Sequence, residues 1–387
     1  MHESWPRSSS VRGVGLLAFA AVLLAACSPA PATGSGSAGT SGSAGAASAG
    51  TAGGTGSVYL LLPATSPSRY VDLDGPLLRT AIESAVPGVS LVVENALGSS
   101  QTQARQMQAA ISAGAKVVML VAVDPAAVAD ELTMAAAAKV PVVLYDRVGR
   151  GGPATALVTV DEQAVGRLQG TGARTYLTRG GGRRTVGRAL GDQTDPVTTQ
   201  LKKGQDEVLD PLFDSGQAVR SCVFYVAHDD PATARTSLDQ CLTANPSLDA
   251  FVVSDDTVAA AAVAAAKAQQ RPVTVIGGQG PDLAAVQNIV LGLQYDTVYV
   301  SSRLEADKAA ELTKSLLTTG TIDKALTPDT VDNGSTAPGV PTAFVPLREL
   351  TLDNVSTVVT DGVFTWQQIC TGPAGATDTC KAHVPGN

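Results

Sequence analysis

The sequence predicts an α/β protein with two lobes, each built on a doubly wound parallel sheet. From Val58 onward, short apolar runs alternate with amphipathic or alanine-rich segments. These runs are continuously apolar, which is typical of strands covered by helices on both faces. A long helical segment, Glu162–Leu177, separates the first series of runs from a second one. Two such series indicate two lobes.

The elements follow one another in regular order. In the first series we expect strands at Val58–Pro63, Leu91–Asn95, Val117–Val123, Val142–Asp146 and Leu157–Val160. Helices are expected between them at Leu73–Val86, Gln101–Ser112 and Pro125–Ala138. In the second series we expect strands at Val186–Leu190, Cys222–Val226, Ala250–Ser254 and Val273–Gly277. Its helices are expected at about Val197–Leu212, Pro231–Thr243 and Thr257–Gln269.

The N-terminus has the pattern of an export signal. Arg7 and Arg12 precede an uncharged apolar run, Gly13–Ala26, that is too short to span a bilayer but suits the core of a signal peptide. The run ends in Leu-Ala-Ala-Cys at Cys27, which resembles the lipobox of bacterial lipoproteins. That resemblance implies that residues 1–26 are removed and that the Cys27 thiol carries lipid. The alternative is an ordinary secretory signal followed by a chance cysteine.

A linker is expected after the anchor. Residues 28–57 are almost entirely Gly, Ser, Ala, Thr and Pro, without a charge or an aromatic ring. Such a segment cannot bury enough apolar surface to offset its ordering entropy. We therefore expect residues 27–57 to be a flexible tether, with an end-to-end distance of roughly 30 Å. The body is then expected on the outer face of the cytoplasmic membrane, held by lipid alone.

Composition excludes some functions and suggests two disulfides. The net charge of −8 argues against nucleic acid as a partner. After the signal segment only His228 and His383 remain, so no spacing of cysteine and histidine predicts a metal site, and no cofactor is expected. In an exported protein, the local pairs Cys222/Cys241 and Cys370/Cys380 are expected to form disulfides. Four buried free thiols are the alternative.

Polar residues stand where the expected strands end. In open parallel sheets, ligands bind beyond the carboxyl ends of the strands. Polar side chains at these positions are also common helix caps, so a single one does not define a site. The polar residues include Arg69, Asp146, Arg147, Asp229, Asp255, Asp256 and Gln279.

Several longer stretches resemble the type I periplasmic substrate-binding proteins of sugar ABC transporters, and most closely the D-xylose-binding branch. The stretch Pro141–Arg147 (PVVLYDR) is similar to the strand that ends in the family's sugar-binding Asp-Arg pair. Others lie in the family's order and spacing, from about Val58 to Phe364. They are Val160–Gly170, Val253–Gln269, Ile276–Tyr299 and Asp332–Phe364.

The resemblance implies a periplasmic binding protein type I fold, in which a three-stranded hinge joins the two lobes. Crossings are expected near Asp161, Tyr295–Asp296 and Asp332–Asn333. The N-terminal lobe would then comprise residues 58–160 and 296–331. The C-terminal lobe and tail would comprise residues 161–295 and 332–387. A monomer is the usual state of this architecture.

The resemblance also implies a ligand set. Asp146 and Arg147 correspond to the sugar-binding pair, Arg69 to an arginine that faces the ligand, and Tyr70 stands where a stacking tryptophan is usual. The alternatives are that Asp146 and Arg147 pair with each other, and that Tyr70 belongs to the core. In the second lobe the expected ligand residues depart from the branch. They are Asp229, Asp255, Asp256 and Gln279.

The expected function is solute binding. The protein would capture a small polar ligand, a xylose-like monosaccharide, between its lobes and deliver it to an ABC permease and its ATPase. The alternative is a ligand-sensing lipoprotein that presents its closed form to a membrane receptor. No hydrolase elbow, zinc-protease motif or phosphate loop is present, so we do not expect an enzyme.

Overall fold

The computed structural model describes residues 56–64, 69–227, 230–336 and 338–384. The expected signal peptide, Cys27 and Asp229 lie outside these residues. Within the described ranges, no helix is long and apolar enough to cross a membrane.

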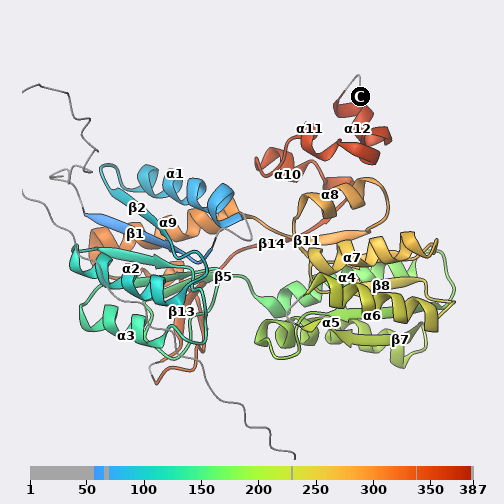
Figure 1. Ribbon diagram of the computed structural model, residues 1–387, viewed down its shortest axis with the longest axis horizontal. Helices are drawn as coiled ribbons and strands as arrows, with labels where there is room; N and C mark the ends of the chain where they lie inside the picture. Colours follow the sequence, from blue (N-terminus) through green and yellow to red (C-terminus); the bar gives the residue numbers. More distant parts are fainter. Residues whose placement is uncertain (1–55, 65–68, 228–229, 337, 385–387) are drawn as a thin grey trace, which may run out of the picture. The chain divides into compact units, whose positions relative to one another are not determined.

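The first lobe is built on a sheet with the strand order β12-β13-β5-β4-β3-β1-β2. Figure 1 shows its strands β1 and β2 beside α1. All neighbouring strands are parallel except β12 and β13, which pair antiparallel. The central strands β3, β4 and β5 are buried along their whole length, as their continuously apolar sequences predict. The strands are β1 (Ser57–Leu62), β2 (Ser90–Asn95), β3 (Val117–Leu120), β4 (Val142–Tyr145), β5 (Ala156–Thr159), β12 (Asp329–Val331) and β13 (Val340–Phe344).

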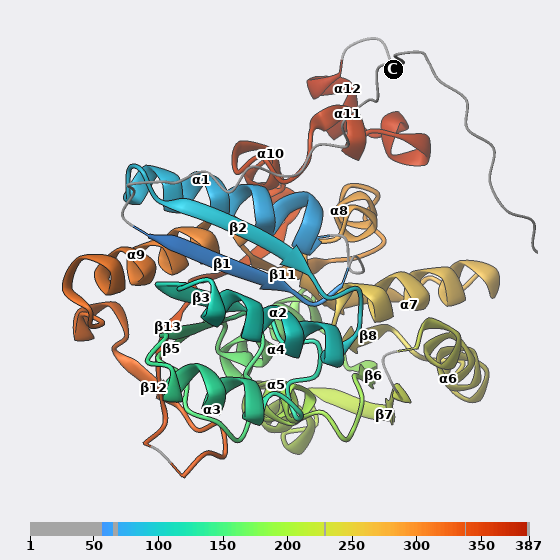
Figure 2. The ribbon, with the colours of Figure 1, turned by 60° about the vertical axis from the view of Figure 1, so that its left-hand side comes forward.

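Helices cover both faces of this sheet. Helices α1 (Gly75–Ala85) and α9 (Ser302–Thr319) pack on one face, through residues such as Leu78 and Leu312. Helices α2 (Ser100–Ser112) and α3 (Ala129–Ala137) pack on the other. Figure 2 shows the two pairs on opposite sides of β1 and β3. A π-helical turn, Tyr70–Asp74, precedes α1, and a 3-10 turn, Lys324–Leu326, follows α9.

The start of α3 differs from the prediction. We expected a helix from Pro125, but α3 begins at Ala129. The carboxylate of Asp124 accepts a hydrogen bond from the Ala126 amide, and its carbonyl accepts one from Ala127. These two bonds form a turn that delays the helix, because aspartate competes for nearby backbone donors.

The second lobe has its own parallel sheet, with the order β7-β6-β8-β9. Helices α4 and α5 pack on one face and α6 and α7 on the other. The doubly wound α/β prediction is therefore confirmed for both lobes. The strands are β6 (Arg184–Leu190), β7 (Ala218–Tyr225), β8 (Ala250–Val253) and β9 (Thr274–Gly277). The helices are α4 (Glu162–Thr178), α5 (Pro196–Asp214), α6 (Pro231–Ala244) and α7 (Asp256–Ala268).

A small third sheet joins β10 (Gln279–Gly280), β11 (Asp296–Val300) and β14 (Leu347–Thr351). Its membership shifts two boundaries from those we predicted. Strand β11 pairs with β10 and β14, so the chain returns to the first lobe after Val300 rather than at residue 296. Strand β13 pairs with β5 of the first lobe, so the last crossing lies between Phe344 and Leu347 rather than at residue 332. Register with a distant strand decides both boundaries.

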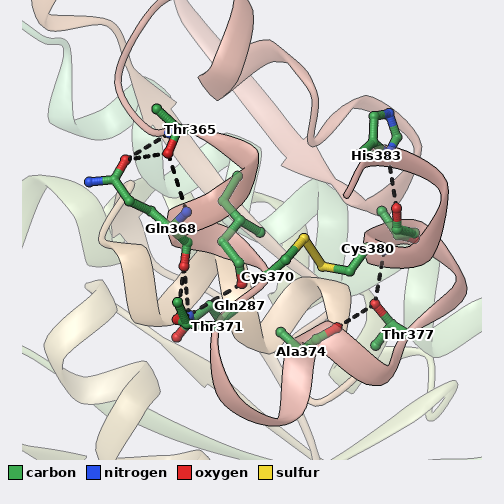
Figure 3. The surroundings of a disulfide bond; sticks show 11 residues. Gln287, Thr365, Gln368, Cys370, Thr371, Ala374, Thr377, Cys380 and His383 are labelled. Atoms are coloured by element: carbon green, nitrogen blue, oxygen red, sulfur yellow. Dashed lines mark hydrogen bonds between the residues drawn. A yellow bond between two sulfur atoms is a disulfide. The ribbon is translucent and has the colours of Figure 1, made fainter. Parts of the chain in front are cut away.

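The C-terminal segment folds onto α8 (Leu283–Val290) as short helices. The side chain of Gln287 on α8 donates hydrogen bonds to the Gln368 carbonyl and the Thr371 hydroxyl, and the Cys370–Cys380 disulfide lies beside them (Figure 3). The apolar faces of α8 and β14 are thereby covered. The short elements are 352–354, α10 (Thr357–Thr360), α11 (Trp366–Ile369), 372–376 and α12 (Asp378–His383).

Both predicted disulfides are confirmed. The Cα atoms of Cys222 and Cys241 are 6.0 Å apart, and those of Cys370 and Cys380 are 5.4 Å apart. The first bond ties β7 to α6. The predicted strand beginning at Cys222 in fact begins at Ala218, so Cys222 lies within β7.

Candidate functional site

The first lobe gathers its polar residues where β4 ends. Asp146 follows the last residue of β4 with a φ of 65°, a left-handed conformation that aspartate tolerates better than most residues. Its amide donates to the Val158 carbonyl, and its own carbonyl accepts from Thr159. The backbone is thus fixed from β5, and the Asp146 side chain, 26% exposed, is left facing outward from the sheet edge.

Tyr70 connects the two members of the predicted pair. Its hydroxyl donates to Oδ2 of Asp146 at 2.7 Å and accepts from Nε of Arg147 at 3.2 Å. Its ring is only 3% exposed and belongs to the core of the first lobe. The stacking role that we expected does not fit this burial, because no ring face is free for a sugar. The alternative that Tyr70 belongs to the core is the one observed.

Arg147 is held by the chain around it. Nη1 donates to the carbonyl oxygens of Ala122 and Val123, at 3.1 and 3.4 Å. Asp146 forms its ion pair with Arg69 rather than with Arg147. Both guanidinium groups lie 5.5 Å from the centroid of the Tyr70 ring. The four residues predicted for the first lobe are therefore brought together at one place.

Arg69 stands among three carboxylates. Its distances are 2.9 Å to Asp74, 2.8 Å to Glu305 and 3.6 Å to Asp146. Burial disfavours the charge on Arg69, but these carboxylates outweigh that effect and raise its pKa. The guanidinium is thus held in place and remains charged.

Asp74 and Glu305 were missed by sequence reasoning. Glu305 is buried on the inner face of α9, in line with Ser302, Ala309 and Leu312. An acid among small and apolar residues at helical spacing is the signal that could have revealed it. It could not reveal the partner, because Arg69 lies 236 residues earlier in the chain.

In the second lobe, Asp255 and Asp256 have different surroundings. Asp255 caps α7, accepting from the Val258 amide and from Ser254. Asp256 is 3% exposed, and its two oxygens accept from the Thr297 hydroxyl at 2.7 Å and the Asp282 amide at 2.9 Å. Through these two bonds Asp256 ties β11 to the loop before α8, and its contact with a ligand stays a prediction.

Gln279 lies half-buried in β10, where its side-chain amide donates to Oε1 of Glu162 at 3.4 Å. Glu162 opens α4, directly after the first crossing. Sequence reasoning did not single it out, because a glutamate in the first turn of a helix is a common dipole partner. Asp229 lies outside the described residues.

The buried carboxyl of Asp256 gives a testable dependence on pH. Burial raises its pKa from 3.8 to about 7, although the Thr297 and Asp282 bonds lower it. Between these values the folded protein holds a proton that the unfolded chain releases, so the free energy of unfolding falls as pH rises. From pH 5 to pH 7 the expected loss from this group is about 2 kcal/mol.

Urea unfolding at both pH values measures this loss. Asp256→Asn, which cannot ionise, should show a smaller fall than the wild type by that amount. Taking the difference between the two proteins removes the contribution of the other carboxyls. An equal fall in both proteins would contradict the assignment.

The residues at the end of β4 can bind the hydroxyl groups of a small molecule. Asp146 can accept hydrogen bonds from two hydroxyls, and a guanidinium can donate to oxygen acceptors in fixed directions. Neighbouring hydroxyls on one small molecule present both kinds of partner. Among the described residues, no group of three or more histidine, cysteine, aspartate or glutamate side chains is arranged to hold a metal ion.

Comparison with known proteins gives concordant results. The sequence pattern described as the periplasmic binding protein domain matches residues 58–321. The D-xylose-binding periplasmic protein of Escherichia coli is 30% identical, over 71% of this chain and 82% of its own length. The protein of the same name from Haemophilus influenzae is 30% identical, over 73% of this chain and 83% of its own length.

A solved structure extends the likeness to the fold. An ABC transporter solute binding protein from Clostridium phytofermentans, with bound β-D-glucose, superposes with a TM-score of 0.68. It covers 81% of this chain and 99% of its own, at 23% identity. At that identity the superposition shows a shared fold, which agrees with the sheets described above.

Proposed function

This chain belongs to the periplasmic binding protein domain family, and we propose that it is an extracytoplasmic solute-binding protein that captures a sugar for an ABC importer. One observation carries the proposal for the ligand. The carboxylate of Asp146 and the guanidinium of Arg147 share one tyrosine hydroxyl at the carboxyl end of β4, where parallel sheets bind their ligands.

The geometry suits a polyhydroxylated molecule. Asp146 keeps acceptor capacity beyond its bond from Tyr70, and its side chain is partly exposed. Arg69 is oriented by Asp74 and Glu305, which leaves it fixed before a ligand arrives. Preorganised groups lose little conformational entropy on binding, so they favour affinity.

Two lobes joined by crossing strands suit a clamp. A ligand that contacts both lobes binds the closed form better than the open one and shifts the population toward it. The closed form would then dock on a permease. The curated relatives, named for D-xylose binding, support a monosaccharide as the ligand.

The lipid anchor remains part of the proposal. Cys27 and the linker that precedes β1 would hold the body at the outer face of the cytoplasmic membrane. The apolar run before Cys27 and the charge-free segment after it support this arrangement. Retention in the detergent phase, lost on Cys27→Ser, is the result that we expect.

Thermal unfolding tests whether the ligand is a sugar. The purified full chain is heated with a panel of pentoses, hexoses and polyols. A sugar at a hundred times its dissociation constant should add about 2.7 kcal/mol to the free energy of unfolding, which raises the melting temperature by a few degrees. Absence of a shift with every compound would contradict the proposal that the ligand is a sugar.

A further inference from the structure

The second lobe presents acids where its strands and the small sheet end. Asp195, Asp255 and Asp282 stand at the starts of α5, α7 and α8. Among the described residues of these loops (191–196, 230–231, 254–257 and 278–282) there is no lysine or arginine. Asp282 is exposed and its side chain makes no capping bond. The start of a helix carries a partial positive charge that attracts anions, and these carboxylates already lie there.

A second observation is independent of these caps. Glu162 uses one oxygen, Oε1, to accept from Gln279, while the other, Oε2, is buried and has no hydrogen-bond partner among the described residues. The ionisable groups with the largest influence on it are Asp146 after β4, Asp195 before α5 and Asp161 beside it, all acids. A buried carboxyl oxygen without a partner costs free energy that a donor from a ligand would recover.

Among the described residues, the arginines of the first lobe do not supply that donor. Arg69 is engaged by Asp74 and Glu305. Arg147 is directed by its bonds to two carbonyls and to Tyr70. The side-chain amide of Gln279 already donates to Oε1 of Glu162 rather than to Oε2. The missing partner is therefore expected to come from the ligand.

We propose that the ligand carries a protonated amine, as an amino sugar or aminated polyol does, and that the Glu162 carboxylate accepts it. This inference rests on the proposed function and narrows its substrate class. The hydroxyls of such a molecule would bind Asp146 and Arg147, while its ammonium would face the acids of the second lobe. A hydrogen bond between two ionised groups is about twice as strong as one between neutral groups.

The proposal implies a measurable proton exchange. Burial raises the pKa of Glu162 to about 8, so the free protein holds a proton there at pH 7. Asp146, Asp195 and Asp161 favour that proton, and the amide of Gln279 opposes it. An arriving ammonium favours the carboxylate, so binding at pH 7 releases up to one proton from Glu162. Affinity should therefore rise between pH 6 and pH 8, as long as the amine stays charged.

Calorimetric titration of the full chain tests this. D-glucosamine, D-galactosamine and D-mannosamine are each compared with the parent hexose and the N-acetyl derivative. We expect at least one amine to bind about tenfold tighter than both of its neutral counterparts. Titration in buffers of different ionisation enthalpy measures the proton released. Glu162→Gln should lose about tenfold in affinity for the amine and abolish the proton release.

The matched control is Glu311→Gln on α9, which removes the same charge from an exposed pair with Lys308. It should change neither quantity. If a neutral sugar binds as tightly as its amine, or if Glu162→Gln leaves the preference intact, the amine assignment is wrong and the proposed sugar function stands. If none of these compounds binds, the amine assignment is wrong, and the thermal panel of pentoses, hexoses and polyols decides the proposed function separately.

Discussion

Asp146→Asn is expected to weaken sugar binding by about ten- to a hundredfold. The carboxylate is the one partly exposed anion of the described cluster at the β4 end, and its loss removes a charged acceptor worth about 1.5–3 kcal/mol. Asparagine is the informative replacement, because it tolerates the left-handed backbone at φ 65° and can still accept from Tyr70. Alanine would add backbone strain to the loss of the contact.

Calorimetry with the sugar identified in the thermal panel measures the change. The control is Asp353→Asn, an exposed aspartate in the C-terminal part of the chain, which should bind as the wild type does. Unfolding curves of both variants verify that the fold is intact. An unchanged affinity of Asp146→Asn for the sugar would mean that other residues bind the ligand.

Gly166→Ala and Gly204→Ala are expected to cause the largest losses of stability. These glycines lie where α4 and α5 cross. A methyl group on Gly166 would overlap the Leu201 carbonyl oxygen, and one on Gly204 would overlap that of Gln163. Because both obstacles are backbone atoms of a packed helix, a rotamer change cannot relieve them. We expect each variant to lose about 3 kcal/mol, despite the gain of about 1 kcal/mol in helix propensity.

Gly170→Ala is the graded comparison on the same helix. Its methyl group would meet Cβ of Val208 first, at 2.8 Å, which is a smaller overlap than those with the backbone oxygens at Gly166 and Gly204. Urea unfolding should therefore rank Gly170→Ala as less destabilising than the other two. Losses below 1 kcal/mol at both Gly166 and Gly204 would contradict the packing described. Because α4 begins at Glu162, a shift of this helix also moves the proposed ammonium acceptor.

Much of the fold could be predicted because its causes are local. Runs such as Val142–Tyr145 are apolar throughout, and only a strand covered on both sides suits them. The disulfide pairs also followed from local spacing and compartment. The lobe boundaries near residues 296 and 332 are less local, because they depend on the pairing of β11 with β14 and of β13 with β5.

The part of the candidate site that lies in the first lobe could be predicted from the sequence. The Asp146-Arg147 pair stands at the end of a clear strand, and a strand's end is a local property. Sequence position did not reveal how Tyr70 is used. A stacking ring was expected there, but the ring packs in the core and only its hydroxyl lies in the site. In the second lobe, adjacent aspartates looked equivalent. Burial separates Asp255, a cap, from Asp256, an interior tie.

The sequence by itself determined the two α/β lobes and the cysteine pairs, because periodicity and spacing express them within a few residues. The resemblance to the family indicated Asp146 and Arg147 as ligand residues. Only the tertiary structure decided that Glu305 holds Arg69 and that Glu162 has a buried oxygen without a partner in the described part of the chain. Such relations depend on which distant segments pack together. Burial changes the free energy of a charge far more than its neighbours in sequence do.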